Sequence, residues 1–104
     1  MNEEIGAKRP LERAPTHPGA LMREILEETL NVSMAEAARR MRISRPALYA
    51  VLNGRSAVTA DMALRFGKFV GAEPALYLNM QTNHDLWQSR QRLKETLERI
   101  EPAA

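Results

Sequence analysis

The sequence contains no cysteine, which removes disulfides and thiolate chemistry from consideration and fits a reducing cytosol. Aromatic residues make up only 5% of the 104 residues, and strand-favouring residues are scattered rather than grouped. No apolar run approaches the roughly 20 residues that a membrane-spanning helix needs. The N-terminal segment also lacks the apolar centre of a signal peptide. Together these absences predict a small all-α domain that is cytoplasmic and has no membrane attachment.

Negative charge is missing from one stretch of a chain that is otherwise nearly balanced. The sequence has 15 Lys and Arg against 13 Asp and Glu, a formal net charge of +2. No carboxylate occurs between Glu36 and Asp61, and five arginines fall in the same interval. A carboxylate repels DNA phosphates, whereas an arginine displaces their condensed counterions, so this pattern is typical of a DNA-facing surface. An ordinary solvated basic face is the alternative that composition alone leaves open.

Two capped helices joined by a short turn are predicted in the middle of the chain. Ser33 and Glu36 have the spacing of a capping box, in which each side chain satisfies a free N–H group at the helix start. Ser44 is placed to cap the next helix, and Gly54 supplies a left-handed end to it. Only three or four residues remain between the two helices, which is the turn length of a helix-turn-helix motif.

Three further helices complete the predicted five-helix fold. The first covers residues 17–30, the fourth begins at Thr59, and the fifth begins near Pro74. The apolar spacing after residue 74 predicts one long helix that continues to about residue 100. Its apolar stripe extends beyond what a five-helix domain needs to cover, so we expect a homodimer interface there. The residues assigned to that interface are Leu86, Trp87, Leu93 and Leu97.

The outward side of the third helix is the predicted DNA-reading surface. Arg45 lies in its first turn, where a recognition helix meets base edges, and an arginine can bind guanine O6 and N7 with two N–H groups. Tyr49 follows one turn later, and Pro46 offers an apolar contact. Asn53 and Arg55 suit a phosphate at the far end. The complete predicted DNA-binding set is Ser33, Arg39, Ser44, Arg45, Pro46, Tyr49, Asn53 and Arg55.

The sequence shows no sign of enzymatic or metal chemistry. Its two histidines, His17 and His84, have no carboxylate cluster at ligand spacing. There is no Ser-His-Asp order around a nucleophile elbow, and no Gly-rich phosphate loop. We therefore expect no catalytic residue, no metal ligand and no cofactor.

Several motifs together resemble the HigA-type antitoxins, which belong to the Cro/C1-repressor-like (XRE) helix-turn-helix class. The matching segments are H-P-G at residues 17–19, residues 33–81, and H-D-L-W-Q-S-R at residues 84–90. The family pattern N-G-basic-x-x-(I/V)-T appears at residues 53–59, and (F/Y/W)-L-N-(L/M)-Q appears at residues 77–81. The resemblance covers about three-quarters of the chain, residues 17–90.

The resemblance implies a lambda-repressor-like, helix-turn-helix DNA-binding domain over residues 17–90 that dimerises through its C-terminal helix. Residues 1–16 lie outside the resemblance; they mix charge with Pro10 and Pro15 and show no helical stripe, so we expect a flexible arm there. Residues 91–104 also lie outside it and are expected to form a helical extension and tail. The resemblance also implies repression of the protein's own operon and binding of a RelE-like (HigB) ribonuclease toxin, as in type II toxin–antitoxin modules. A stand-alone transcriptional regulator without a toxin, and a protein-interaction module with an incidental basic patch, remain as alternatives.

Overall fold

The computed structural model describes residues 14–103 of the chain. These residues form six α-helices and one π-helical segment, with no strand among them, so the all-α prediction is confirmed. Residues 1–13, which include most of the predicted N-terminal arm, lie outside the described part. In chain order the elements are α2 (Gly19–Glu24), η2 (Ile25–Thr29), α3 (Met34–Met41), α4 (Arg45–Leu52), α5 (Ala60–Val70), α6 (Pro74–Arg92) and α7 (Lys94–Arg99).

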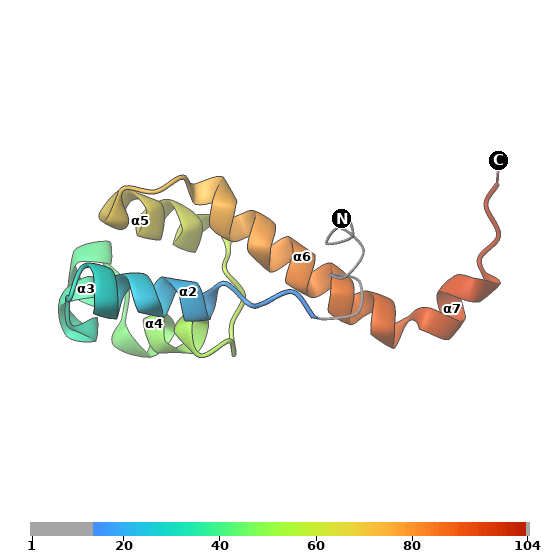
Figure 1. Ribbon diagram of the computed structural model, residues 1–104, viewed down its shortest axis with the longest axis horizontal. Helices are drawn as coiled ribbons and strands as arrows, with labels where there is room; N and C mark the ends of the chain where they lie inside the picture. Colours follow the sequence, from blue (N-terminus) through green and yellow to red (C-terminus); the bar gives the residue numbers. More distant parts are fainter. Residues whose placement is uncertain (1–13, 104) are drawn as a thin grey trace, which may run out of the picture.

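The elements α2 to α5 gather into a globular unit, and α6 begins beside α5 and extends away from it (Figure 1). The short α7 lies at the far end of α6, well separated from the globular unit. The first predicted helix corresponds to α2 followed by η2, and the next four correspond to α3, α4, α5 and α6. None of the helices within residues 14–103 has the length and apolar character needed to cross a membrane.

Side-chain caps begin three helices at the predicted residues. Ser33, Ser44 and Thr59 each place a side-chain oxygen 3.0 to 3.2 Å from the backbone N–H three residues later. Each cap therefore satisfies one of the free donors at a helix start. The other hydrogen bond of the capping box, from the Ser33 N–H to the Glu36 carboxylate, is not among those of the described residues. The Glu36 carboxylate pairs instead with Arg39, at 2.7 Å. An arginine one turn away thus competes successfully for the carboxylate.

The turn between α3 and α4 consists of Arg42, Ile43 and Ser44, as predicted. Arg42 adopts the left-handed conformation, with φ 62° and ψ 45°, and so ends α3. Arg65 reaches this turn from α5 and donates to the carbonyls of Met41 at 2.8 Å and Arg42 at 3.1 Å. These carbonyls belong to the helix end, where acceptors have no partner within the helix. The interaction therefore connects α5 to the centre of the helix-turn-helix motif.

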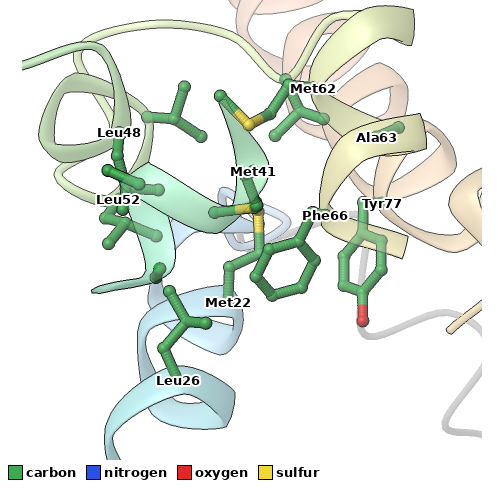
Figure 2. Close-up of a cluster of buried hydrophobic side chains, with 13 residues drawn as sticks. Met22, Leu26, Met41, Leu48, Leu52, Met62, Ala63, Phe66 and Tyr77 are labelled. Atoms are coloured by element: carbon green, nitrogen blue, oxygen red, sulfur yellow. The ribbon is translucent and has the colours of Figure 1, made fainter. Parts of the chain in front are cut away.

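The core lies where α2 to α6 meet, and its buried side chains come from every one of these elements (Figure 2). The rings of Phe66 and Tyr77 pack edge to face, with centroids 5.0 Å apart. Gly19 lets α2 approach the end of α4, since a Cβ atom there would collide with the Val51 carbonyl oxygen. The buried hydrophobic residues are Met22, Leu26, Ala37, Ala38, Met41, Leu48, Val51, Leu52, Val58, Met62, Ala63, Phe66 and Tyr77.

The C-terminal helix is not continuous, in contrast to the sequence prediction. It is interrupted at Leu93, whose φ of −98° and ψ of 11° separate α6 from α7. None of the residues of α7 is buried. Most helical stability in proteins comes from packing of an apolar face, and α7 has no such packing in the described chain to enforce a straight helix.

Candidate DNA-binding surface

The recognition helix α4 buries one side and exposes the other. Its three buried residues belong to the core, and the opposite side presents Arg45, Pro46 and Asn53 to solvent. Tyr49, one turn after Arg45, is half-buried. The residues predicted to read DNA therefore lie on a face of α4 that is open to a duplex.

The two N-cap serines are exposed at the starts of α3 and α4. Because the oxygens of Ser33 and Ser44 accept backbone N–H groups within the caps, their hydroxyl protons remain available for donation. The first-turn N–H groups and the positive end of each helix dipole also favour an anion nearby. Both positions therefore suit contacts with phosphate oxygens.

Arg39 is 70% exposed and forms an ion pair with Glu36, whose side chain is 40% exposed. The hydrogen bond from Arg39 lowers the pKa of the Glu36 carboxyl below its ordinary value of 4.5. Glu36 is the residue that borders the carboxylate-free stretch. The Glu36 carboxylate therefore offsets part of the positive charge of Arg39, which is one of the predicted phosphate contacts.

Arg23 belongs beside the candidate surface, although no pattern in the sequence singles it out. Its Nη2 donates to Asn53 Oδ1 at 2.5 Å, and its Nη1 pairs with Glu27 at 3.2 Å. The link orients the Asn53 amide and leaves its N–H groups as the available donors. Since Arg23 and Asn53 are 30 residues apart, no local spacing pattern connects them.

The segment after α4, residues 53–58, carries the exposed Arg55. Gly54 has φ 78°, the left-handed conformation predicted for a helix stop. We call residues 53–58 the phosphate loop, after the contact predicted for it. His17 Nε2 lies 3.1 Å from the Ser56 carbonyl oxygen, and its Nδ1 accepts the N–H of Gly19 at 2.9 Å. No group of His, Asp and Glu that could hold a metal ion is found within residues 14–103.

The remaining arginines of the carboxylate-free stretch face elsewhere. The Arg40 guanidinium lies 4.8 Å from the ring centroid of Phe69, in a cation–π contact with α5. A hollow lies between the end of α3 and α5, and its lining includes Arg40, Phe69, Arg42, Arg65 and Lys68. The positive charge of the stretch is therefore divided between two surfaces, and Arg40 and Arg42 are not in the predicted DNA-binding set.

Of the predicted dimer residues, Leu86 and Trp87 lie on α6, Leu97 lies on α7, and Leu93 lies at the break between the two helices. Leu86 is 46% exposed on α6, and Leu97 is 45% exposed on α7. Trp87 and Leu93 are half-buried, and the buried Nε1 of Trp87 has no hydrogen-bond partner in the described part of the chain. Because α6 ends before Leu93, the four residues do not share one straight helix face.

Comparison with known sequences matches the helix-turn-helix domain family to residues 22–76, more than half of the chain. The HTH-type transcriptional regulator YbaQ of Escherichia coli K12 is 32% identical over 94 residues, which cover 88% of this chain and 83% of that protein. Antitoxin HigA-1 of Vibrio cholerae is 27% identical, with 90% and 89% of the two chains covered.

Solved structures of antitoxins are also similar to this chain. A HigA-family addiction module antidote protein from Coxiella burnetii has a TM-score of 0.78 and 32% identity, covering 86% of this chain and 99% of that chain. The antitoxin GraA in complex with its operator has a TM-score of 0.79 and 31% identity, covering 88% and 94%. The Pseudomonas aeruginosa antitoxin HigA with the higBA promoter has a TM-score of 0.78 and 25% identity, covering 86% and 99%.

The short turn, the caps and the exposed side of α4 define a helix-turn-helix protein with a lambda-repressor-like fold. The chain belongs to the helix-turn-helix family, and within that family it is of the HigA antitoxin type, as its motifs indicated. The relatives described above are named as transcriptional regulators and antitoxins, not as enzymes, in agreement with the expected non-enzymatic function.

Proposed function

We propose that this protein is a sequence-specific DNA-binding repressor that recognises operator DNA through the exposed side of α4. The observation that carries the proposal is the placement of Arg45, Pro46 and Tyr49 on that side, within a stretch that has no carboxylate. GraA and the Pseudomonas aeruginosa HigA, which share the fold, are structures with operator and promoter DNA, and this supports the proposal.

Sequence reading falls to the first two turns of α4. With α4 in the major groove, the Arg45 guanidinium binds the O6 and N7 atoms of a guanine through two N–H groups. Tyr49 reaches a base or a phosphate one turn further along, and the apolar surface of Pro46 meets a thymine methyl group. Recognition therefore combines one bidentate arginine contact to guanine with apolar contacts.

Phosphate contacts orient α4 on the duplex. Ser33 and Ser44 donate from the helix starts, and the exposed Arg39 on α3 and Arg55 after α4 supply charge. Asn53 adds the amide donors that Arg23 leaves free. Because each contact releases condensed counterions, operator binding weakens steeply as the salt concentration rises.

The proposed repressor acts as a homodimer. An exposed pair of leucines on α6 and α7, with the half-buried Trp87 and Leu93, provides apolar surface outside the core. Two copies related by a two-fold axis would place their α4 helices in successive major grooves, about 34 Å apart. The operator is then a pseudo-palindrome.

The likeness to HigA-type proteins supports a second activity, that of an antitoxin. In this proposal the protein binds a RelE-like (HigB) ribonuclease toxin encoded beside it, blocks the toxin by covering its active surface in the cytoplasm, and represses their shared operon. Relatives such as YbaQ, which are named only as transcriptional regulators, favour the alternative of a stand-alone regulator without a toxin.

Two experiments test these proposals separately. A gel shift with the DNA upstream of the protein's own gene should show binding at concentrations at which random DNA of equal length stays free. If both DNAs shift equally, or neither shifts, the sequence-specific repressor is rejected. Co-expression with the product of the neighbouring gene should give a stable complex and relieve any growth arrest that this product causes. If no complex forms, the stand-alone regulator is supported.

A further inference from the structure

The phosphate loop contains no helix or strand, yet a helix distant in the sequence holds one end of it. Val58 is 3% exposed, and its backbone N–H donates to Gln81 Oε1 at 2.7 Å. Gln81 is 5% exposed and lies on α6. A buried amide is unfavourable unless it is hydrogen-bonded, so this glutamine is matched to the loop.

A second contact fixes the orientation of the glutamine amide. Gln81 Nε2 donates to Asp85 Oδ1 at 3.0 Å, one turn further along α6. Because the carboxylate can only accept, the amide must turn its nitrogen toward Asp85 and its oxygen toward Val58. The acceptor for the loop is therefore set by a pair of residues on α6.

His17 holds the middle of the phosphate loop in a similar way. Its Nδ1 accepts the Gly19 N–H at 2.9 Å, which leaves Nε2 as the donor to the Ser56 carbonyl at 3.1 Å. The His17 ring packs edge to face against His84 on α6, with centroids 5.4 Å apart. His84 is itself held by a hydrogen bond from its Nδ1 to the Pro15 carbonyl at 2.8 Å.

We propose that Gln81 and His17 are positioning residues for operator binding, which hold the phosphate loop in the conformation that presents Arg55 to DNA. This inference rests on the proposed DNA-binding function. A loop that is already ordered before binding avoids the conformational entropy that a free loop would lose at the interface. The two residues thus act through the loop and do not touch DNA themselves.

The same contacts connect DNA binding to α6. Gln81 precedes Leu86 and Trp87 on this helix, so one element carries one of the loop anchors and part of the proposed dimer interface. A partner that shifts or steadies α6 therefore acts on the loop through these hydrogen bonds.

The Gln81→Leu substitution removes the acceptor while keeping a side chain of similar size. We expect about tenfold weaker operator binding, with the loss arising from the disordered loop. The slope of log K against log salt should fall in magnitude by roughly two, because the homodimer loses one phosphate contact in each half-site. Amide hydrogen exchange at Val58 should become faster. The wild-type protein must bind the upstream DNA first, and its failure to do so would reject the proposed function rather than this inference.

A charge-matched double variant provides the rescue. When Gln81→Glu is combined with Asp85→Asn, the new carboxylate accepts from both the Val58 N–H and the amide introduced at position 85, and the net charge of the pair is unchanged. We expect operator affinity within about threefold of wild type. Asp85→Asn alone, which removes the charge but leaves Gln81 in place, separates the effect of charge from that of the acceptor.

A purely structural role is tested with Leu26→Ala, a core substitution in η2 at a residue that makes none of the loop hydrogen bonds. It should lower the melting temperature at least as much as Gln81→Leu but leave operator affinity and salt dependence unchanged at a temperature where both variants are folded. Equal affinity loss in the two variants, or no rescue by the double variant, overturns the proposal. If Gln81→Leu does not fold, His17→Phe decides the question by the same binding and salt measurements, because it keeps an aromatic ring but removes the nitrogens that contact Ser56 and Gly19.

Discussion

Arg65 on α5 donates a hydrogen bond to the backbone carbonyl of Met41, 2.8 Å away at the end of α3. The same Nη1 atom also lies 3.1 Å from the carbonyl of Arg42, the left-handed residue that turns the chain toward α4. One exposed side chain therefore satisfies acceptors that the end of α3 leaves open. The direction in which α4 leaves the turn depends in part on this contact.

The Arg65→Ala variant should be less stable than wild type by about 1.5 kcal/mol, the lower end of the range for a hydrogen bond to a charged group, because Arg65 is exposed to solvent. Urea unfolding followed by circular dichroism measures the change. Lys68→Ala is the matched control, because Lys68 lines the same hollow on α5, and its stability should stay within about 0.5 kcal/mol of wild type. Equal unfolding midpoints for the two variants would show that the Arg65 contact does not stabilise the turn.

The helices were predictable because their signals are local. Ser33, Ser44 and Thr59 cap the helices that follow them, and the left-handed Gly71 ends α5. These features depend on residues within one or two turns, and the residue types at the helix ends indicate them. The interruption at Leu93 was not predictable from the apolar spacing, which continues across it.

Much of the site depends on pairs that are far apart in the sequence. Arg23 meets Asn53, and Gln81 meets Val58, across separations of 30 and 23 residues. No spacing rule connects such residues, so the sequence identified the exposed side of α4 but not what holds its far end. The partner of the Glu36 carboxylate is a local question that the sequence leaves open, because both Ser33 and Arg39 lie three residues away. The structure shows that Arg39 is the partner.

Replacing Glu36 with Gln should strengthen binding to operator and random DNA alike, by about threefold, because it removes a carboxylate and releases Arg39 for a phosphate. Fluorescence anisotropy at several salt concentrations should show a steeper salt dependence. Glu95→Gln on α7 removes the same charge away from α4 and should have little effect. If Glu36→Gln weakens binding, the ion pair positions Arg39 for DNA instead of neutralising it.

The same ion pair sets a pH limit. Arg39 lowers the pKa of the Glu36 carboxyl below 4.5, so the pair contributes to stability above the unfolded value and its contribution is lost as pH falls through the folded one. Between pH 6 and 8 this group stays ionised, and DNA binding by Glu36→Gln should exceed that of wild type by a constant factor. A ratio that changes across this interval would assign the titration to another group.

Leu97→Asp tests the proposed homodimer. Placing an unpaired carboxylate in an apolar interface is strongly unfavourable, so the variant should be monomeric at micromolar concentration by light scattering and should bind its operator more weakly. Leu64→Asp is the control, because Leu64 is an exposed leucine on α5 outside the predicted interface. If Leu97→Asp remains a dimer with normal operator affinity, α7 takes no part in the interface.

Arg45 and Arg55 should differ in what their loss does to DNA recognition. Arg45→Ala should cost about 1–3 kcal/mol on the operator and relax the preference at one base step in each half-site, because a bidentate contact to guanine is removed. Arg55→Ala should weaken operator and random DNA to a similar extent and flatten the salt dependence, because a phosphate contact carries charge but no sequence information. Binding to a set of operator variants at two salt concentrations measures both effects. If Arg45→Ala binds every sequence more weakly by the same factor, Arg45 contacts a phosphate, and base reading passes to Tyr49 and Pro46.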